Sequence, residues 1–84
     1  MKVFNFIHDA GHGWIKVDKN FFNSLNILNK ISSYSYQDED NYFLEEDCDA
    51  YVFVEALKNK NINFSFNERI FNGYCFVRNL QSVK

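Results

Sequence analysis

The chain has 84 residues and a formal net charge of −2, which argues neither for nor against a nucleic-acid partner. A chain of this length forms a single domain, residues 1–84, and buries only about 60% of the surface that its unfolded form exposes. Its ten Phe, five Tyr and one Trp supply the large apolar area that so small a core needs. No apolar run approaches the ~20 residues that span a bilayer, so we expect no membrane insertion.

The two cysteines, Cys48 and Cys75, fit no Cys-x-x-Cys metal or redox motif. The N-terminus, Met1-Lys2-Val3, leads straight into a strand-like segment, so we expect no signal peptide. We therefore expect a cytoplasmic protein in which both thiols are reduced and mostly buried.

A hairpin and a short helix are predicted at the N-terminal end. Apolar residues alternate from Lys2 to Ile7, which is typical of a strand, and residues 14–17 form a second one. The turn between them, residues 8–13, contains two glycines, which we expect to adopt positive φ. Asp18 is a suitable N-cap for a helix from Lys19 to Leu25.

A second hairpin is predicted in the middle of the chain. Ser and Tyr alternate from Ser32 to Gln37, which favours a strand with Tyr34 and Tyr36 on one face. A charged turn over residues 38–41 and a return strand over residues 42–44 complete it. Tyrosines at alternate strand positions either pack against neighbouring side chains or stack on a base or small ligand.

A second helix is predicted to begin near Asp47, its expected N-cap. Ala50, Phe53, Val54 and Leu57 follow at helical spacing, so we expect them to face the core.

The C-terminal third predicts two more strands. Alternation favours a strand from Asn61 to Glu68, and the pair Asn72-Gly73 favours a tight turn before a final strand over residues 74–77. The polar tail, residues 79–84, is expected to fray. The resulting order, ββα-ββα-ββ, predicts an α+β fold with a mostly antiparallel sheet and two helices on one face.

Acidic residues are concentrated in the middle of the chain. Eight of the eleven lie between Asp38 and Glu55, and no Lys or Arg occurs between Ile31 and Leu57. The acids near the predicted helix start have a structural explanation, because negative charge stabilises a helix N-terminus. The turn at residues 38–40 lacks such an explanation. It is either an ordinary solvated hairpin tip or, as we expect, part of a recognition surface for a basic protein. The residues of this surface would be Asp38, Glu39, Asp40, Glu45, Glu46, Asp47 and Asp49.

Metal binding by these acids has weak support, since Asp47-Cys48-Asp49 lacks the Asp-x-Asp-x-Asp-Gly pattern of an EF-hand.

The most unusual local string is His8-Asp9-Ala10-Gly11-His12-Gly13-Trp14. Its histidines and carboxylate could bind zinc or act as an acid–base pair. Their spacing is not the helical His-Glu-x-x-His pattern, however, so we assign no metal, cofactor or catalytic residue. The string is either a structural turn or part of a ligand site, whose residues would be His8, Asp9, His12, Trp14, Tyr34 and Tyr36.

Three strings carry a family resemblance. The string from His8 to Trp14 reads HDAGHGW, that from Ile31 to Tyr36 reads ISSYSY, and that from Leu44 to Ala50 reads LEEDCDA. On these strings the chain resembles a group of small proteins encoded by phages, prophages and plasmids. The resemblance covers most of the chain and is weakest from Asn67 to Lys84. It implies an accessory role, such as blocking a host defence system in the manner of anti-CRISPR or anti-restriction proteins.

The leading functional hypothesis is therefore a non-enzymatic inhibitor that binds a basic surface of a host defence protein. The sequence is compatible with either a monomeric or a homodimeric inhibitor. A second hypothesis is a small-ligand or nucleotide-binding protein that acts as a sponge. A third is a metal-dependent hydrolase that uses His8, Asp9 and His12. Direct nucleic-acid binding is disfavoured, because no basic residues lie near Tyr34 and Tyr36 in the sequence.

Overall fold

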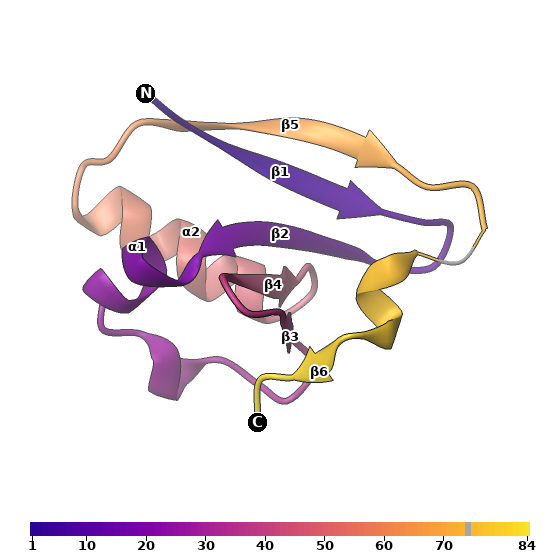
Figure 1. Ribbon diagram of the computed structural model, residues 1–84. Helices are drawn as coiled ribbons and strands as arrows, with labels where there is room; N and C mark the ends of the chain where they lie inside the picture. The colour runs from indigo at the N-terminus through magenta and orange to yellow at the C-terminus, as the bar shows by residue number, and fades with distance from the viewer. Residues whose placement is uncertain (74) are drawn as a thin grey trace.

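The first hairpin forms where hydrophobic alternation predicts it. In the computed structural model, which describes residues 1–73 and 75–84, β1 (Lys2–His8) pairs antiparallel with β2 (Gly13–Asp18) (Figure 1). The alternation works because successive side chains of a strand point to opposite faces of the sheet. Both predicted strands are therefore confirmed, each extended by one or two residues.

The predicted capping of the first helix is also confirmed. The Asp18 carboxylate accepts a hydrogen bond of 3.1 Å from the Phe21 amide at the start of α1 (Lys19–Ser24). Asn26 follows the helix with a φ of 57°, a left-handed conformation that Asn tolerates better than most residues. A short 3₁₀ helix, η1 (Leu28–Lys30), then leads toward the second hairpin.

The second hairpin is shorter than predicted. Only β3 (Tyr36–Gln37) is strand, and it pairs antiparallel with β4 (Asn41–Glu45). The four residues before β3 form a turn instead, because the hydroxyls of Ser32 and Ser35 donate hydrogen bonds to the carboxylate of Asp49. The Ser-Tyr alternation thus predicted a strand where side-chain hydrogen bonds impose a turn.

The second helix, α2 (Asp49–Asn59), begins one residue later than the predicted N-cap implies. Its N-cap is Cys48, which makes no side-chain capping bond, so the assignment of Asp47 as N-cap is wrong. The core-facing stripe is confirmed for Phe53 and Leu57, which are fully buried, and for Ala50, which packs against the core cluster. Val54 is only half-buried and lines a surface groove instead. Cap preference alone could not choose among adjacent acids, because several suit a helix start equally well.

The sheet is mixed, and its order is β5-β1-β2-β4-β3-β6. The strands β1 and β4 run in the same direction, since both are antiparallel to β2. The helix α2 carries the chain from β4 to the outer edge, where β5 (Phe64–Ile70) pairs parallel with β1. The α+β class is confirmed, and β1–β5 is the parallel pair in an otherwise antiparallel sheet.

The C-terminal segment differs most from the prediction. The predicted strand over residues 74–77 is wrong for residues 75–77. These residues lead into and begin a 3₁₀ helix, η2 (Phe76–Asn79). Tyr74, the first residue of the predicted strand, lies outside the described residues. The expected fraying of the tail is also wrong. Its strand β6 (Gln81–Ser82) pairs with β3, and the Val83 amide donates to the Ser35 carbonyl.

Apolar side chains cover both faces of the sheet. The helix face carries the larger cluster, whose buried members are Phe4, Ile15, Val17, Phe22, Leu25, Ile27, Ile31, Tyr42, Leu44, Phe53 and Leu57. The opposite face carries a smaller one beneath η2: Ile7, Trp14, Phe43, Cys75 and Val77. The sheet thus separates a helix-covered core from a second face that the C-terminal segment covers only in part.

The glycines of the first turn have a different role from the one predicted. The glycine with positive φ in the described chain is Gly73, not Gly11 or Gly13. At Gly13 the constraint is space, because an added Cβ would lie 2.5 Å from Cζ of Phe6 and 3.0 Å from Oε2 of Glu46. Gly13 therefore permits close packing at the point where β2 begins.

Candidate functional site

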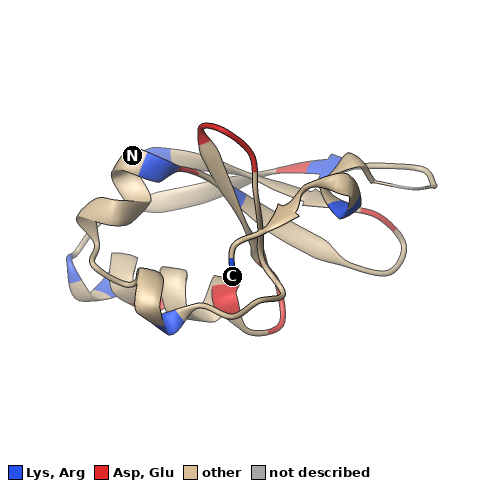
Figure 2. Cartoon of the chain, turned by 60° about the horizontal axis from the view of Figure 1, so that its bottom comes forward, with Lys and Arg blue, Asp and Glu red and all other residues tan. Residues whose placement is uncertain are grey.

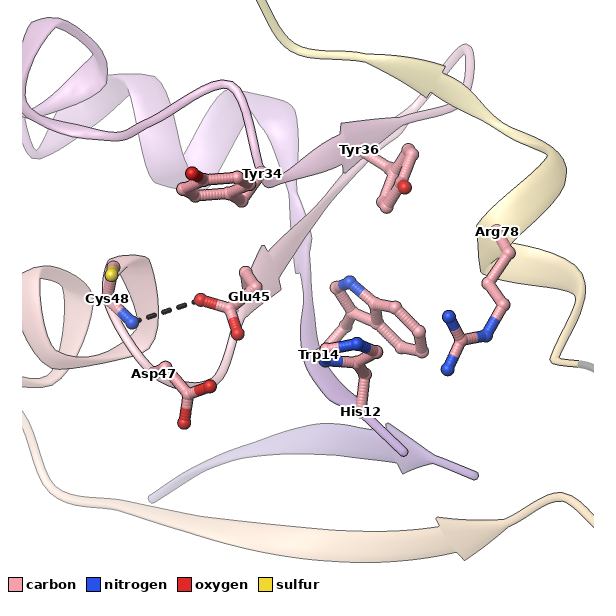
Figure 3. Close-up of a pocket in the computed structure, with 8 residues that line it drawn as sticks. All are labelled: His12, Trp14, Tyr34, Tyr36, Glu45, Asp47, Cys48 and Arg78. Carbon is pink, nitrogen blue, oxygen red and sulfur yellow. Dashed lines mark hydrogen bonds between the residues drawn. The ribbon is translucent and has the colours of Figure 1, made fainter. Parts of the chain in front are cut away.

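A cavity of about 290 Å³ lies on the side of the sheet that carries the smaller cluster (Figure 3). This volume is at the lower end of the range for small-molecule sites. Side chains from β2, β3, β4, η2 and three turns form its wall: His12, Trp14, Tyr34, Tyr36, Glu45, Asp47, Cys48 and Arg78.

Strand register brings the central residues of the cavity together. Trp14 of β2 lies opposite Glu45 of β4, and Tyr36 of β3 lies opposite Phe43. Because side chains alternate between the faces, Trp14, Glu45 and Tyr36 all project to the same side of the sheet. Tyr34, on the preceding turn, is 67% exposed and completes the wall.

Trp14 carries an unsatisfied hydrogen-bond donor. The side chain is 2% exposed, yet its indole Nε1 has no hydrogen-bond partner among residues 1–73 and 75–84. In Figure 3 this nitrogen lies on the side of the ring toward Tyr34, Tyr36 and Glu45. A buried indole N–H usually finds an acceptor, so its position at the cavity wall points to an acceptor on a bound molecule.

Two carboxylates, those of Glu45 and Asp47, also line the cavity. Glu45 is 8% exposed, and its Oε1 accepts a hydrogen bond of 3.1 Å from the Cys48 amide. Asp47 is exposed on the adjoining turn. In the described part of the chain neither carboxylate makes an ion pair, so both contribute negative charge to the cavity.

The cation at the cavity edge is already neutralised. Arg78 of η2 donates from Nε and Nη2 to the two carboxylate oxygens of Asp9, at 2.8 and 2.9 Å, and its guanidinium lies 5.5 Å from the Trp14 ring. Asp9 also accepts hydrogen bonds from the amides of Gly11 and His12. The Arg78 hydrogen bond, followed by that from His12, holds the pKa of Asp9 well below its usual range.

The expected cluster of His8, Asp9 and His12 does not assemble. Nε2 of His8 lies 3.1 Å from Glu68 on β5, whereas the His12 ring packs against Trp14 at 6.1 Å. Asp9 is bound to Arg78. Across residues 1–73 and 75–84, no group of three or more His, Cys, Asp or Glu side chains is placed to hold a metal ion. The three residues of the hydrolase hypothesis therefore do not form one cluster in this structure.

The acidic middle divides into separate sites rather than one surface. The turn at residues 38–40 precedes β4 and the acids at 46–49 follow it, so roughly 14 Å of strand separates them. Figure 2 shows these acids in separate loops. Asp49 is buried against Ser32 and Ser35, and Glu45 is buried at the cavity. Neither of them can belong to an exposed recognition surface.

The expectation that the 38–40 turn lacks a structural role is wrong for Asp38. Its carboxylate accepts hydrogen bonds from the amides of Asp40 and Asn41, which closes the β3–β4 turn. The exposed acids that remain for a protein partner are Glu39, Asp40, Glu46 and Asp47.

Four of the six predicted ligand residues line the cavity: His12, Trp14, Tyr34 and Tyr36. His8 and Asp9 do not. Cys48 and Arg78 were assigned no role by sequence reasoning, and Glu45 and Asp47 were assigned to a partner surface instead. Both cysteines are free thiols, with Cys75 buried as expected but Cys48 exposed.

Comparisons with protein-family models, with curated proteins and with solved structures find no match for this chain. The likeness to proteins of phages, prophages and plasmids therefore stays a prediction. No helix in the described residues is long and apolar enough to cross a membrane.

Proposed function

We propose that this protein binds a small molecule in the cavity between Trp14, Tyr34 and Glu45. The observation that carries the proposal is the indole Nε1 of Trp14, which is buried at the cavity wall and has no acceptor in the described part of the chain. A native fold rarely leaves a buried donor unsatisfied, and a ligand acceptor would remove that cost. The remaining wall combines aromatic faces with a few polar groups, as small-molecule sites commonly do.

The protein carries its own reporter for this proposal, because Trp14 is its single tryptophan. A compound that enters the cavity should change Trp14 emission and raise the thermal midpoint. A ligand at a hundred times its Kd stabilises the folded state by about 2.7 kcal/mol. A broad panel of metabolites that changes neither signal would contradict the proposal.

Tyr34→Ala should weaken ligand binding about tenfold, a loss of about 1.4 kcal/mol, because it removes an aromatic face from the wall. The matched control is Tyr51→Ala, since both rings are 67% exposed and only Tyr34 lines the cavity. Neither change should shift the free energy of unfolding by more than about 0.5 kcal/mol. Equal affinity of the two variants, measured by calorimetry, would remove Tyr34 from the site.

A second candidate function, binding of a protein partner, is favoured by a groove on the helix face. Its lining is mostly apolar and comes from β1, β2, β5 and α2: Phe6, Ile15, Ala50, Tyr51, Val54 and Phe66, with Glu46 and Glu68. Phe66 is exposed, and no Lys or Arg is among these lining residues. Apolar walls between two carboxylates complement a partner segment that presents apolar and basic side chains. Inhibition of a host defence protein would belong to this second function.

Glu46→Lys/Glu68→Lys should weaken binding of a labelled Leu/Lys amphipathic helical peptide about tenfold or more. Glu39→Lys/Asp40→Lys changes the net charge equally at the β3–β4 turn and serves as the control. Fluorescence anisotropy measures both affinities, with a Leu/Glu peptide as the negative probe. Equal losses in the two double variants would indicate general charge attraction and would argue against the groove.

A further inference from the structure

We infer that the ligand of the cavity is a small organic cation that also carries a neutral hydrogen-bond acceptor. This inference rests on the proposed function and specifies its ligand class. It follows from three properties of the cavity wall. The wall carries negative charge that no cation pairs with among the described residues, it presents aromatic faces, and it holds the indole N–H of Trp14, a donor that needs an acceptor.

The negative charge of the cavity wall disfavours anionic ligands. The carboxylates of Glu45 and Asp47 lie at the cavity without an ion pair among the described residues, whereas Arg78 is held by Asp9 through two hydrogen bonds. Glu45 is nearly buried, so its charge acts through a medium of lower dielectric than water. A phosphate would meet these carboxylates, and a cation would be attracted to them.

The aromatic faces favour a cation for an independent reason. The rings of Trp14, Tyr34 and Tyr36 line the same cavity, and Trp14 meets Tyr36 edge-on at 6.2 Å. Figure 3 shows Tyr34 and Tyr36 on the same side of the cavity, with Trp14 and Glu45 facing them. The negative face of an aromatic ring attracts ammonium groups, and rings combined with carboxylates form the cages that bind alkylated ammonium ions.

The indole of Trp14 specifies the second group of the ligand. Its Nε1 is a donor only, so the ligand must offer an oxygen or nitrogen lone pair at that wall. A neutral hydroxyl, ether or carbonyl suits this position better than a carboxylate, because Glu45 lies opposite Trp14 in the β2–β4 register. The cation and the acceptor must be close together to fit about 290 Å³.

Three matched probes separate these contributions. Choline has a quaternary ammonium and a hydroxyl, 3,3-dimethyl-1-butanol has the same shape and hydroxyl without the charge, and ethyltrimethylammonium has the charge without the hydroxyl. We expect choline to change Trp14 emission and raise the thermal midpoint, with affinity at least about tenfold above that of the neutral alcohol. Ethyltrimethylammonium should fall between them.

Glu45→Gln tests the charge within the protein. The amide oxygen can still accept from the Cys48 amide, so the turn is retained while the charge is lost. Choline affinity should fall about tenfold and that of 3,3-dimethyl-1-butanol should stay unchanged. Glu39→Gln, which makes the same exchange on the exposed β3–β4 turn, should leave both affinities unchanged.

Trp14→Phe tests the donor, with binding measured by calorimetry because the fluorophore is lost. Choline should lose more affinity than ethyltrimethylammonium, since only choline has an acceptor for the indole N–H. Binding of guanosine or inorganic phosphate in place of choline would overturn the cation inference while leaving the proposed function intact. If neither choline nor ethyltrimethylammonium changes Trp14 emission or the thermal midpoint at millimolar concentration, the cation inference fails. The proposed function fails as well only when the broad panel of metabolites is also silent.

Discussion

Asp49→Ala is expected to destabilise the protein by about 3 kcal/mol or more, because it leaves one buried and two partly buried donors without their acceptor. Asp49 is 2% exposed and accepts hydrogen bonds from the Ser32 amide at 2.9 Å, from the Ser32 hydroxyl at 2.8 Å and from the Ser35 hydroxyl. A domain of this size has a total stability of roughly 4–12 kcal/mol, so the loss is a large fraction of it. Urea denaturation followed by far-UV circular dichroism measures the change.

Asp47→Ala is the matched control, because it removes the same side chain two residues away at an exposed position. Its free energy of unfolding should stay within about 0.5 kcal/mol of the wild type. Asp49→Asn should fall between the two, since its amide oxygen still accepts one of the hydrogen bonds. Equal stability of the Asp47 and Asp49 alanine variants would show that the serine network contributes nothing.

The Asp49 network also positions one wall of the cavity. The Ser32 hydroxyl that donates to Asp49 accepts a hydrogen bond from the Tyr34 amide at 3.1 Å. Ser35, at the other end of the turn, donates to Asp49 and accepts from the Glu45 amide at 3.0 Å. One buried carboxylate at the start of α2 therefore links Tyr34 to Glu45, and the acidic middle owes part of its charge to this structural role.

Local patterns in the sequence predicted the parts of the fold that local forces determine. Alternation identified β1 and β2, and the capping preference of Asp18 placed the start of α1. The Ser-Tyr alternation also placed Tyr34 and Tyr36 on one side, and both line the cavity, although Tyr34 lies on a turn and not on the predicted strand. These features depend on residues within a few positions of one another, so a single sequence contains the information.

Contacts between distant segments could not be predicted in this way. Arg78 meets Asp9 across 69 residues of sequence, and Trp14 meets Glu45 through a strand register that no local pattern reports. Charge composition was misleading for a related reason. It counts Glu45 and Asp49 with the exposed acids, although the fold buries both of them.

Asp9→Asn is expected to lower the stability of the protein near neutral pH and to flatten its loss of stability in acid. Hydrogen bonds from Arg78, then from the His12 amide, keep the pKa of Asp9 in the folded state well below its usual value of about 4. The folded state therefore binds this proton less readily than the unfolded state does. The interaction stabilises the fold fully above about pH 4, and its contribution is lost as pH falls through the lower folded pKa.

Urea denaturation at a series of pH values between about 2 and 7 measures this effect, because the slope of stability against pH reports the difference in bound protons. Asp38→Asn is the control, since Asp38 also accepts backbone amides in a turn but makes no ion pair among the described residues. The acid-dependent loss should be shallower in Asp9→Asn than in Asp38→Asn. Parallel curves for the two variants would contradict a stabilising role for the Asp9–Arg78 pair.

Asp9→Asn should also change which ligands the cavity binds. Asp9 is 4% exposed and compensates the positive charge of Arg78, whose guanidinium lies over Trp14 at the cavity edge. In Asp9→Asn that charge is no longer balanced by the carboxylate, so the potential in the cavity becomes less negative. Choline affinity at neutral pH should then fall while that of its neutral isostere should not. Asp9 would thus contribute to cation binding without contacting the ligand, by neutralising Arg78.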